Sequence, residues 1–326
     1  MLARIAHELF WLGRDLTRAE HTARTLDGTF HADIAGAPGE RSISLTWDAV
    51  LTIIGGKPPM PGEDALEVAQ RTEARPLGRA ETARLLTVDT DSQASIVSCV
   101  ARARERGRIL RDVISTEMWE ALNSFYLSLG RYDLAHAMQT GPYSVYHEVK
   151  ERCALFWGLV DRTMLRDDGR AFLEAGGRIE QADMVLRMLL VTVPGESAAD
   201  GHESEAIALL HSVGGAQAYR RAVRDAPTVV PVVRFLLYDS SYPGSVASSV
   251  AALRDALTEA DAQPRSSPPV LRLERLIAEL ELQRRTPGSG VALHAILGRV
   301  QRELELIDRD IGDRYFAMAA LAAVHL

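Results

Sequence analysis

Apolar residues recur along this chain at steps of three and four, which is the spacing of one face of an α-helix. One such stripe runs from Leu2 to Phe30, and others cover residues 96–129 and 296–311. No run of alternating apolar and polar residues competes with them. The pattern predicts an all-α bundle with helices of roughly 15–35 residues. Proline and glycine gather between the stripes, as is typical of connections, at 36–39, 55–62, 194–201, 226–231, 263–269 and 286–290.

The chain also contains an internal repeat. A shift of 163 positions lays residues 9–30 over 172–193 and keeps every position of the apolar stripe apolar. A shift of 150 positions gives a second match, which carries residues 89–104 onto 239–254 with Asp, Ser and Arg kept in order. The first shift also pairs small and charged residues, namely Gly13 with Gly176, Glu20 with Asp183 and Arg24 with Arg187.

These matches predict two related halves, 1–150 and 165–326, within a single helical domain over residues 1–326. The first helix of each half carries further apolar side chains beside its stripe, at residues 10–11 and 172–173. Each of these helices therefore needs neighbours on more than one side, which two separate domains would not supply. We expect the halves to pack together about a pseudo-twofold axis.

Composition is that of an ordinary soluble protein and narrows the possible functions. Of the 326 residues, 47% are hydrophobic and 25% are charged, as in typical globular proteins. The net charge of −7 argues against a nucleic-acid partner. The longest apolar run, 317–324, is far shorter than the roughly 20 residues that span a bilayer. With no signal-peptide pattern at the N-terminus, we expect a cytoplasmic protein that does not associate with membranes.

No set of residues has the spacing of a metal site or of a familiar catalytic motif. Cys99 and Cys153 lie far apart and are expected to be buried, reduced thiols. The nine histidines are scattered without ligand spacing, so each is expected to be a surface side chain or a satisfied core side chain. The four tryptophans fall at apolar helical positions and are expected in the core.

Four segments resemble a known family. They are MLARIAHELFWLGRDLTRAEHTARTLD from residue 1, LRDVISTEMWEALN from residue 110, FLEAGGRIEQADMVLRML from residue 172 and FLLYDSSYPGSV from residue 235. Together they resemble the alpha-E family of bacterial helical proteins, in the family's order and over residues 1 to about 257. The first and third segments resemble the two copies of its Glu-Arg helix.

The Glu-Arg dyad of that family is split between the two copies. In the first copy Thr17 replaces the glutamate and Arg18 is present, whereas in the second copy Glu180 is present and Gln181 replaces the arginine. The proposed pseudo-symmetry would bring Arg18 and Glu180 together at the axis, so that one copy complements the other.

The resemblance also implies partners. Members of the family are encoded beside, or fused to, a circularly permuted ATP-grasp protein, often with a transglutaminase-like and a proteasome-like peptidase. Such a set implies an ATP-dependent system that forms amide bonds on a peptide. The ATP and Mg²⁺ would be held by the ATP-grasp partner, and no cofactor is expected on this chain.

Charged residues on the repeated helices and in the second family-like segment are the candidate binding residues. Pairs such as Glu20 with Arg24 stand at i, i+4, which suits either an exposed helix pair worth about 0.2–0.5 kcal/mol or a groove between the halves. Five arginines between 102 and 111 suit a solvated face or, by forked hydrogen bonds, an anion site. The complete set is Arg14, Arg18, Glu20, Arg24, Arg111, Glu117, Arg178, Glu180, Asp183 and Arg187.

Two functions remain open at this point. The favoured one is a non-catalytic helical subunit that binds the ATP-grasp ligase and presents its peptide or amino-acid substrate in an Arg/Glu-lined groove. The alternative is an enzyme in its own right, in which Glu117 and Glu180 perform acid/base or acyl-transfer chemistry on a peptide. A nucleic-acid-binding regulator is disfavoured by the negative net charge.

Overall fold

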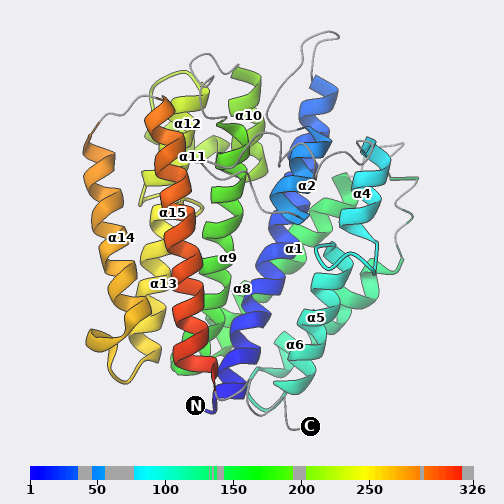
Figure 1. The fold of residues 1–326 in the computed structure, drawn as a ribbon. Helices are drawn as coiled ribbons and strands as arrows, with labels where there is room; N and C mark the ends of the chain where they lie inside the picture. Colours follow the sequence, from blue (N-terminus) through cyan, green and yellow to red (C-terminus); the bar gives the residue numbers. More distant parts are fainter. Residues whose placement is uncertain are drawn as a thin grey trace.

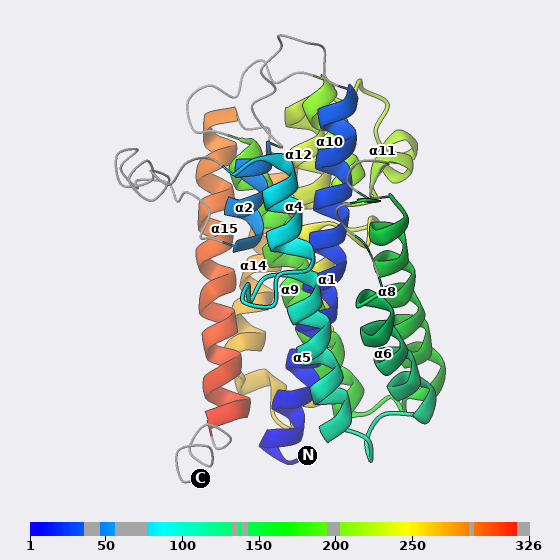
Figure 2. The same cartoon turned by 90° about the vertical axis from the view of Figure 1, so that its right-hand side faces the viewer.

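The computed structural model of this protein describes residues 1–35, 46–55, 77–131, 133, 136–137, 143–193, 203–286 and 290–317. All regular structure within these ranges is helical, which confirms the predicted all-α class. The helices stand side by side as an elongated bundle (Figures 1 and 2). Their bounds are α1 Ala3–Ala35, α2 Trp47–Gly55, α4 Arg79–Thr87, α5 Ile96–Ile109, α6 Thr116–Leu129, α8 Tyr143–Thr163, α9 Asp168–Thr192, α10 Glu203–Ser212, α11 Ala216–Ala222, α12 Val229–Tyr238, α13 Val246–Ala260, α14 Pro268–Arg285 and α15 Gly290–Ile311.

The two long helices α1 and α9 form the centre of the bundle. They run in the same direction, with the N-terminus of the chain paired to Asp168 at the start of α9. Helices α5, α8 and α10 pack on α1, whereas α13 and α15 pack on α9. The predicted apolar stripes of residues 9–30 and 172–193 are buried almost throughout. Each central helix thus has neighbours on several sides, as its extra apolar residues required.

Glycine allows the backbones of α1 and α9 to touch. A methyl group on Gly13 would overlap the carbonyl oxygen of Leu173, and one on Gly176 would overlap that of Phe10. The two contacts are reciprocal, because Gly13 follows Phe10 by three residues and Gly176 follows Leu173 by three. No residue with a side chain fits at either glycine without separating the helices.

The apolar stripe at residues 96–129 does not form one continuous helix. Helix α5 ends at Ile109, and α6 begins at Thr116 after a turn. Ser115 causes the restart, because its side chain caps α6 by accepting a hydrogen bond from the backbone N–H of Met118 at 3.2 Å. Apolar spacing persists through the turn because Leu110 and Ile114 still face the core.

Two of the predicted connections are partly helical. Within 226–231, α12 already begins at Val229, with Pro231 in its first turn. Within 263–269, a short 3₁₀ turn is followed by α14, which begins at Pro268. Proline is tolerated in a first helical turn because the N–H groups there have no partner within the helix.

The remaining expectations about the core are met in part. Cys99 and Cys153 are free and buried, as predicted. The four tryptophans are only partly buried and pack against the core from its edge, which differs from the expectation that they lie within it. Among the described residues, no helix is long and apolar enough to cross a membrane.

Replacement of Gly176 by alanine is expected to lower the free energy of unfolding by about 1–3 kcal/mol, because the new methyl group meets a backbone carbonyl that cannot rotate away. Gly158→Ala on α8 is the matched control. That position has open space around it, so alanine should raise stability by about 0.5–1 kcal/mol. Urea unfolding followed by circular dichroism measures both. Equal stability of the two variants would contradict the packing described here.

Candidate functional site

A buried ion network lies where α1 and α9 meet. The Glu180 carboxylate of α9 is fully buried. It accepts hydrogen bonds from Nε of Arg14 at 2.9 Å and from Nε of Arg18 at 2.5 Å, both on α1. Arg14 also donates to Asp308 of α15 at 2.8 Å, which ties a third helix to the pair.

These contacts fix the charge of Glu180. Burial alone would raise the pKa of its carboxyl group, but the charges of Arg18 and Arg14 outweigh burial and lower the pKa to about 2. Burial alone would lower the pKa of the Arg14 guanidinium, but the charges of Glu180 and Asp308 outweigh burial and raise it. Glu180 and Arg14 are therefore both charged near neutral pH.

Asp183 and Arg187, one turn further along α9, form the next charged pair. Nε of Arg187 lies 2.8 Å from the Asp183 carboxylate, and Asp183 accepts a hydrogen bond from Nε2 of Gln301 at 2.7 Å. Because Gln301 belongs to the buried face of α15, this pair contributes to helix packing.

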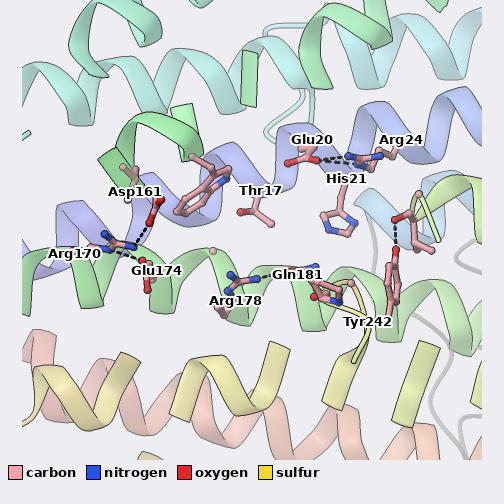
Figure 3. A pocket seen from close by; sticks show the side chains of 17 residues that line it. Thr17, Glu20, His21, Arg24, Asp161, Arg170, Glu174, Arg178, Gln181 and Tyr242 are labelled. Atoms are coloured by element: carbon pink, nitrogen blue, oxygen red, sulfur yellow. Dashed lines mark hydrogen bonds and ion pairs between the residues drawn. The ribbon is translucent and has the colours of Figure 1, made fainter. Parts of the chain in front are cut away.

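A cavity of about 490 Å³ lies beside the same two helices (Figure 3). Helix α1 contributes Glu20 and Arg24, and α9 contributes Arg178, so three of the predicted residues meet there. The other lining residues come from α1, α8, α9 and two turns: Thr17, His21, Trp157, Val160, Asp161, Arg170, Glu174, Gly177, Gln181, Val213, Gly214, Tyr242, Pro243 and Gly244.

Two turns close one end of the cavity. Gly214 adopts a positive φ of 70°, which glycine tolerates readily, and a side chain there would meet the guanidinium of Arg24. The Tyr242 hydroxyl donates to the carbonyl of Val213 at 2.7 Å and so joins the two turns. Nε2 of Gln181 donates to the carbonyl of Pro243 at 3.1 Å, which fastens the second turn to α9.

Most of the charges in the cavity are paired. Arg24 bonds to Glu20 at 2.8 Å, and Arg170 bonds to Glu174 at 2.7 Å and to Asp161 at 3.1 Å. Arg178 differs, because its only polar partner among the described residues is the side-chain oxygen of Gln181 at 3.2 Å.

His21 is one of the cavity residues that sequence reasoning missed, together with Asp161, Arg170 and Glu174. It is 7% exposed, its ring extends from α1 toward Gln181 (Figure 3), and its Nδ1 atom has no hydrogen-bond partner. Burial lowers its pKa, so the imidazole is neutral near pH 7. Its spacing in the sequence does not distinguish it from the other histidines.

Arg111 and Glu117 do not join the other candidates. Arg111 lies in the turn after α5 and stacks on the Trp119 ring at 4.3 Å, while Glu117 is exposed in the first turn of α6. The break before Thr116 turns this segment away from the α1–α9 pair.

The arginine run before them is divided between packing and surface. Arg102 and Arg106 both donate to the buried Asp15 of α1, at 2.9 and 3.0 Å. Arg108 pairs with Glu105 on the outer side of α5. Arg104 also pairs with Glu105, but its Nε donates to the side-chain oxygen of Asn123 on α6 at 2.9 Å. Arg104, Arg108 and Arg111 do not form one continuous basic face, because α5 ends at Ile109.

The family can now be stated from comparison with known proteins. Residues 1–316 match the family described as Alpha-E, a predicted alpha-helical domain with a conserved ER motif. The chain belongs to the Alpha-E family. The split Glu-Arg dyad of this Alpha-E protein is reassembled in space, because Arg18 of one helix bonds directly to Glu180 of the other.

Similar proteins are longer than this chain. Uncharacterized proteins of Mycobacterium bovis and Mycobacterium tuberculosis (strain CDC 1551 / Oshkosh) are both 25% identical to it over 327 residues. Each match covers 95% of this chain and 36% of the relative, so the Alpha-E chain spans about a third of their length. No solved structure matches it significantly.

Three of the four family-like segments line the cavity. The first supplies Glu20 and His21, the third supplies Arg178 and Gln181, and the fourth supplies Tyr242 with its two neighbours. No cluster of three or more metal-ligating side chains occurs within the described part of the chain.

Substitution of Glu180 by glutamine is expected to cost about 3–5 kcal/mol at pH 7, because it removes the anion of Arg18 and leaves the buried Arg14 with Asp308 alone. The wild-type carboxylate has a pKa of about 2 in the folded protein against an ordinary 4.5. A lowered folded pKa stabilises the protein above about pH 5, and this contribution is lost as the pH falls toward 2. The free energy of unfolding of Glu180→Gln should therefore fall less than that of the wild type over this pH interval.

Guanidinium chloride unfolding at several pH values measures the effect. Glu281→Gln is the control, since Glu281 also bonds two arginines but lies on the surface, where water and salt screen the pair. It should leave the unfolding midpoint nearly unchanged. Identical pH profiles for wild type and Glu180→Gln would contradict the assignment.

Proposed function

We propose that this Alpha-E protein is an accessory subunit of a circularly permuted ATP-grasp amide ligase, and that it presents a peptide or amino-acid substrate in the cavity beside α1 and α9. The observation that carries the proposal is the convergence of three family-like segments on that one cavity. These segments are distant in sequence, and they place charged side chains on the wall of the cavity in addition to packing the central helices.

The charges of the cavity suit a polar organic substrate. Three carboxylates and three guanidinium groups line it, with a neutral histidine between them. Such a balanced lining offers hydrogen bonds to both ends of an amino acid or a peptide. ATP and Mg²⁺ would be held by the ligase, in the cytoplasm, with the two associated peptidases acting on the same peptide.

The length of the relatives supports action together with a further protein unit. In the mycobacterial relatives, the matched region is joined to nearly twice its own length of additional chain. A helical unit that is part of a longer protein in some organisms is expected to work beside an equivalent partner in others.

The enzymatic alternative assigned proton transfer to Glu117 and Glu180. A general acid or base needs a pKa near the working pH, whereas Arg14 and Arg18 hold the pKa of Glu180 at about 2. Glu117 lies exposed at the start of α6, outside the cavity. No observation favours this pair as a catalytic centre.

We further propose that the halves 1–150 and 165–326 are equivalent units about a pseudo-twofold axis between α1 and α9. The reciprocal glycine contacts support this, since the shift of 163 that pairs Gly13 with Gly176 also pairs Phe10 with Leu173. Packing of α5 on α1 and of α13 on α9 is a second correspondence, because those helices carry the matched segments 89–104 and 239–254.

Each half expressed separately is therefore expected to lack a cooperative unfolding transition, because its central helix would expose the apolar face that the other half covers. Mixing the two halves should restore the helical signal and the transition. Circular dichroism with thermal melting measures this. An isolated half that folds as a stable monomer would contradict the shared core.

Co-purification with the ATP-grasp protein encoded beside this chain tests the proposed function. A stable complex on gel filtration is expected, with the rate of ATP hydrolysis in the presence of substrate changed at least several-fold by adding the chain. The ligase alone is the control. Absence of both a complex and a rate change would refute the subunit assignment.

A further inference from the structure

The cavity contains two buried polar atoms that lack partners. They are Nδ1 of His21 and Nη1 of Arg170, and both residues line it. Leaving a buried polar atom unpaired is costly, so such atoms are rare in folded proteins and need an explanation. Both atoms have almost no accessible surface, so the polar groups that a bound molecule can reach are the other charged atoms that line the cavity.

The charges are distributed unevenly along the cavity. At one end Arg170 is shared by two carboxylates, Asp161 and Glu174, so that this end carries one net negative charge. Two helical turns further along α9, Arg178 has an amide oxygen as its partner, so that this second region carries one net positive charge. The pair of Glu20 and Arg24 is neutral as a unit.

Helix α9 sets the spacing between the two ends. Arg170, Glu174 and Arg178 follow one another at intervals of four residues along α9 and point into the cavity (Figure 3). Four residues of helix rise by about 6 Å and eight by about 12 Å. A peptide extends by about 3.3–3.6 Å per residue, so two or three residues reach from one charged end to the other.

We propose that the cavity binds a zwitterionic peptide of two or three residues, with its α-carboxylate on Arg178 and its α-ammonium group between Asp161 and Glu174. The inference rests on the proposed function, because it names the class of molecule that the subunit presents. The guanidinium of Arg178 offers forked hydrogen bonds to a carboxylate. The volume of about 490 Å³ accommodates such a ligand.

Calorimetric titration of the full chain, without the ligase, tests the proposal with three probes: Ala-Ala, N-acetyl-Ala-Ala and Ala-Ala amide. Ala-Ala should bind, and removal of either terminal charge should weaken binding at least about tenfold, which is the loss of one charged contact. Equal binding of all three probes, or no binding of any of them, would overturn the proposal.

Two variants separate the ends of the site. Arg178→Gln should weaken Ala-Ala at least about tenfold, and Asp161→Asn should weaken Ala-Ala while leaving N-acetyl-Ala-Ala unchanged, because that probe has no ammonium group. Both positions border solvent, so the fold should persist. Arg108→Gln on the outer side of α5 is the control and should bind all probes like the wild type.

Inorganic phosphate is the last probe in the titration. Phosphate that binds through Arg178 more tightly than Ala-Ala would identify a simple anion site and overturn the peptide assignment. Peptide binding is measured on this chain alone, so its failure would refute the peptide site even if a complex with the ligase forms. Failure to form that complex would refute the subunit assignment even if the peptide binds.

Discussion

Contact between the backbones of α1 and α9 at Gly13 and Gly176 sets the geometry of everything around it. Helices this close leave no room for a layer of apolar side chains between them. Polar side chains therefore border the contact between α1 and α9 on both sides. On one side, Glu180 becomes fully buried and needs two arginines to keep its charge. On the other side, Gly177 makes room for the Trp157 indole, and the cavity lies beside it. The ion network and the cavity are thus two results of one close approach.

The regular parts of this arrangement follow from the sequence, because a helix repeats its own spacing. Residues 2–30 predict α1, and the split dyad predicts that Arg18 meets Glu180. The break before α6 depends on a single capping serine. The apolar spacing continues across it, so the spacing alone does not predict the break. Asp308 reaches Arg14 across almost the whole chain, and no local pattern reports such a contact.

The cavity could be predicted only in part for a similar reason. Glu20, Arg24 and Arg178 were found because they stand on the repeated helices, whereas Arg170 and Glu174 gain significance only when α8 brings Asp161 beside them. His21 resembles any scattered histidine until its surroundings are known. Burial and the absence of a partner are properties of the packed protein, which is why spacing could not single it out.

The divided dyad has a consequence for which helices can pair. Two copies of α1, packed as α1 packs on α9, would place Arg18 opposite Thr17 and so bring cations together without an anion. Two copies of α9 would place Glu180 opposite Gln181 and so bury two anions without a cation. Each helix is therefore a poor partner for a copy of itself, and the ion pair favours contact between α1 and α9 over both alternatives.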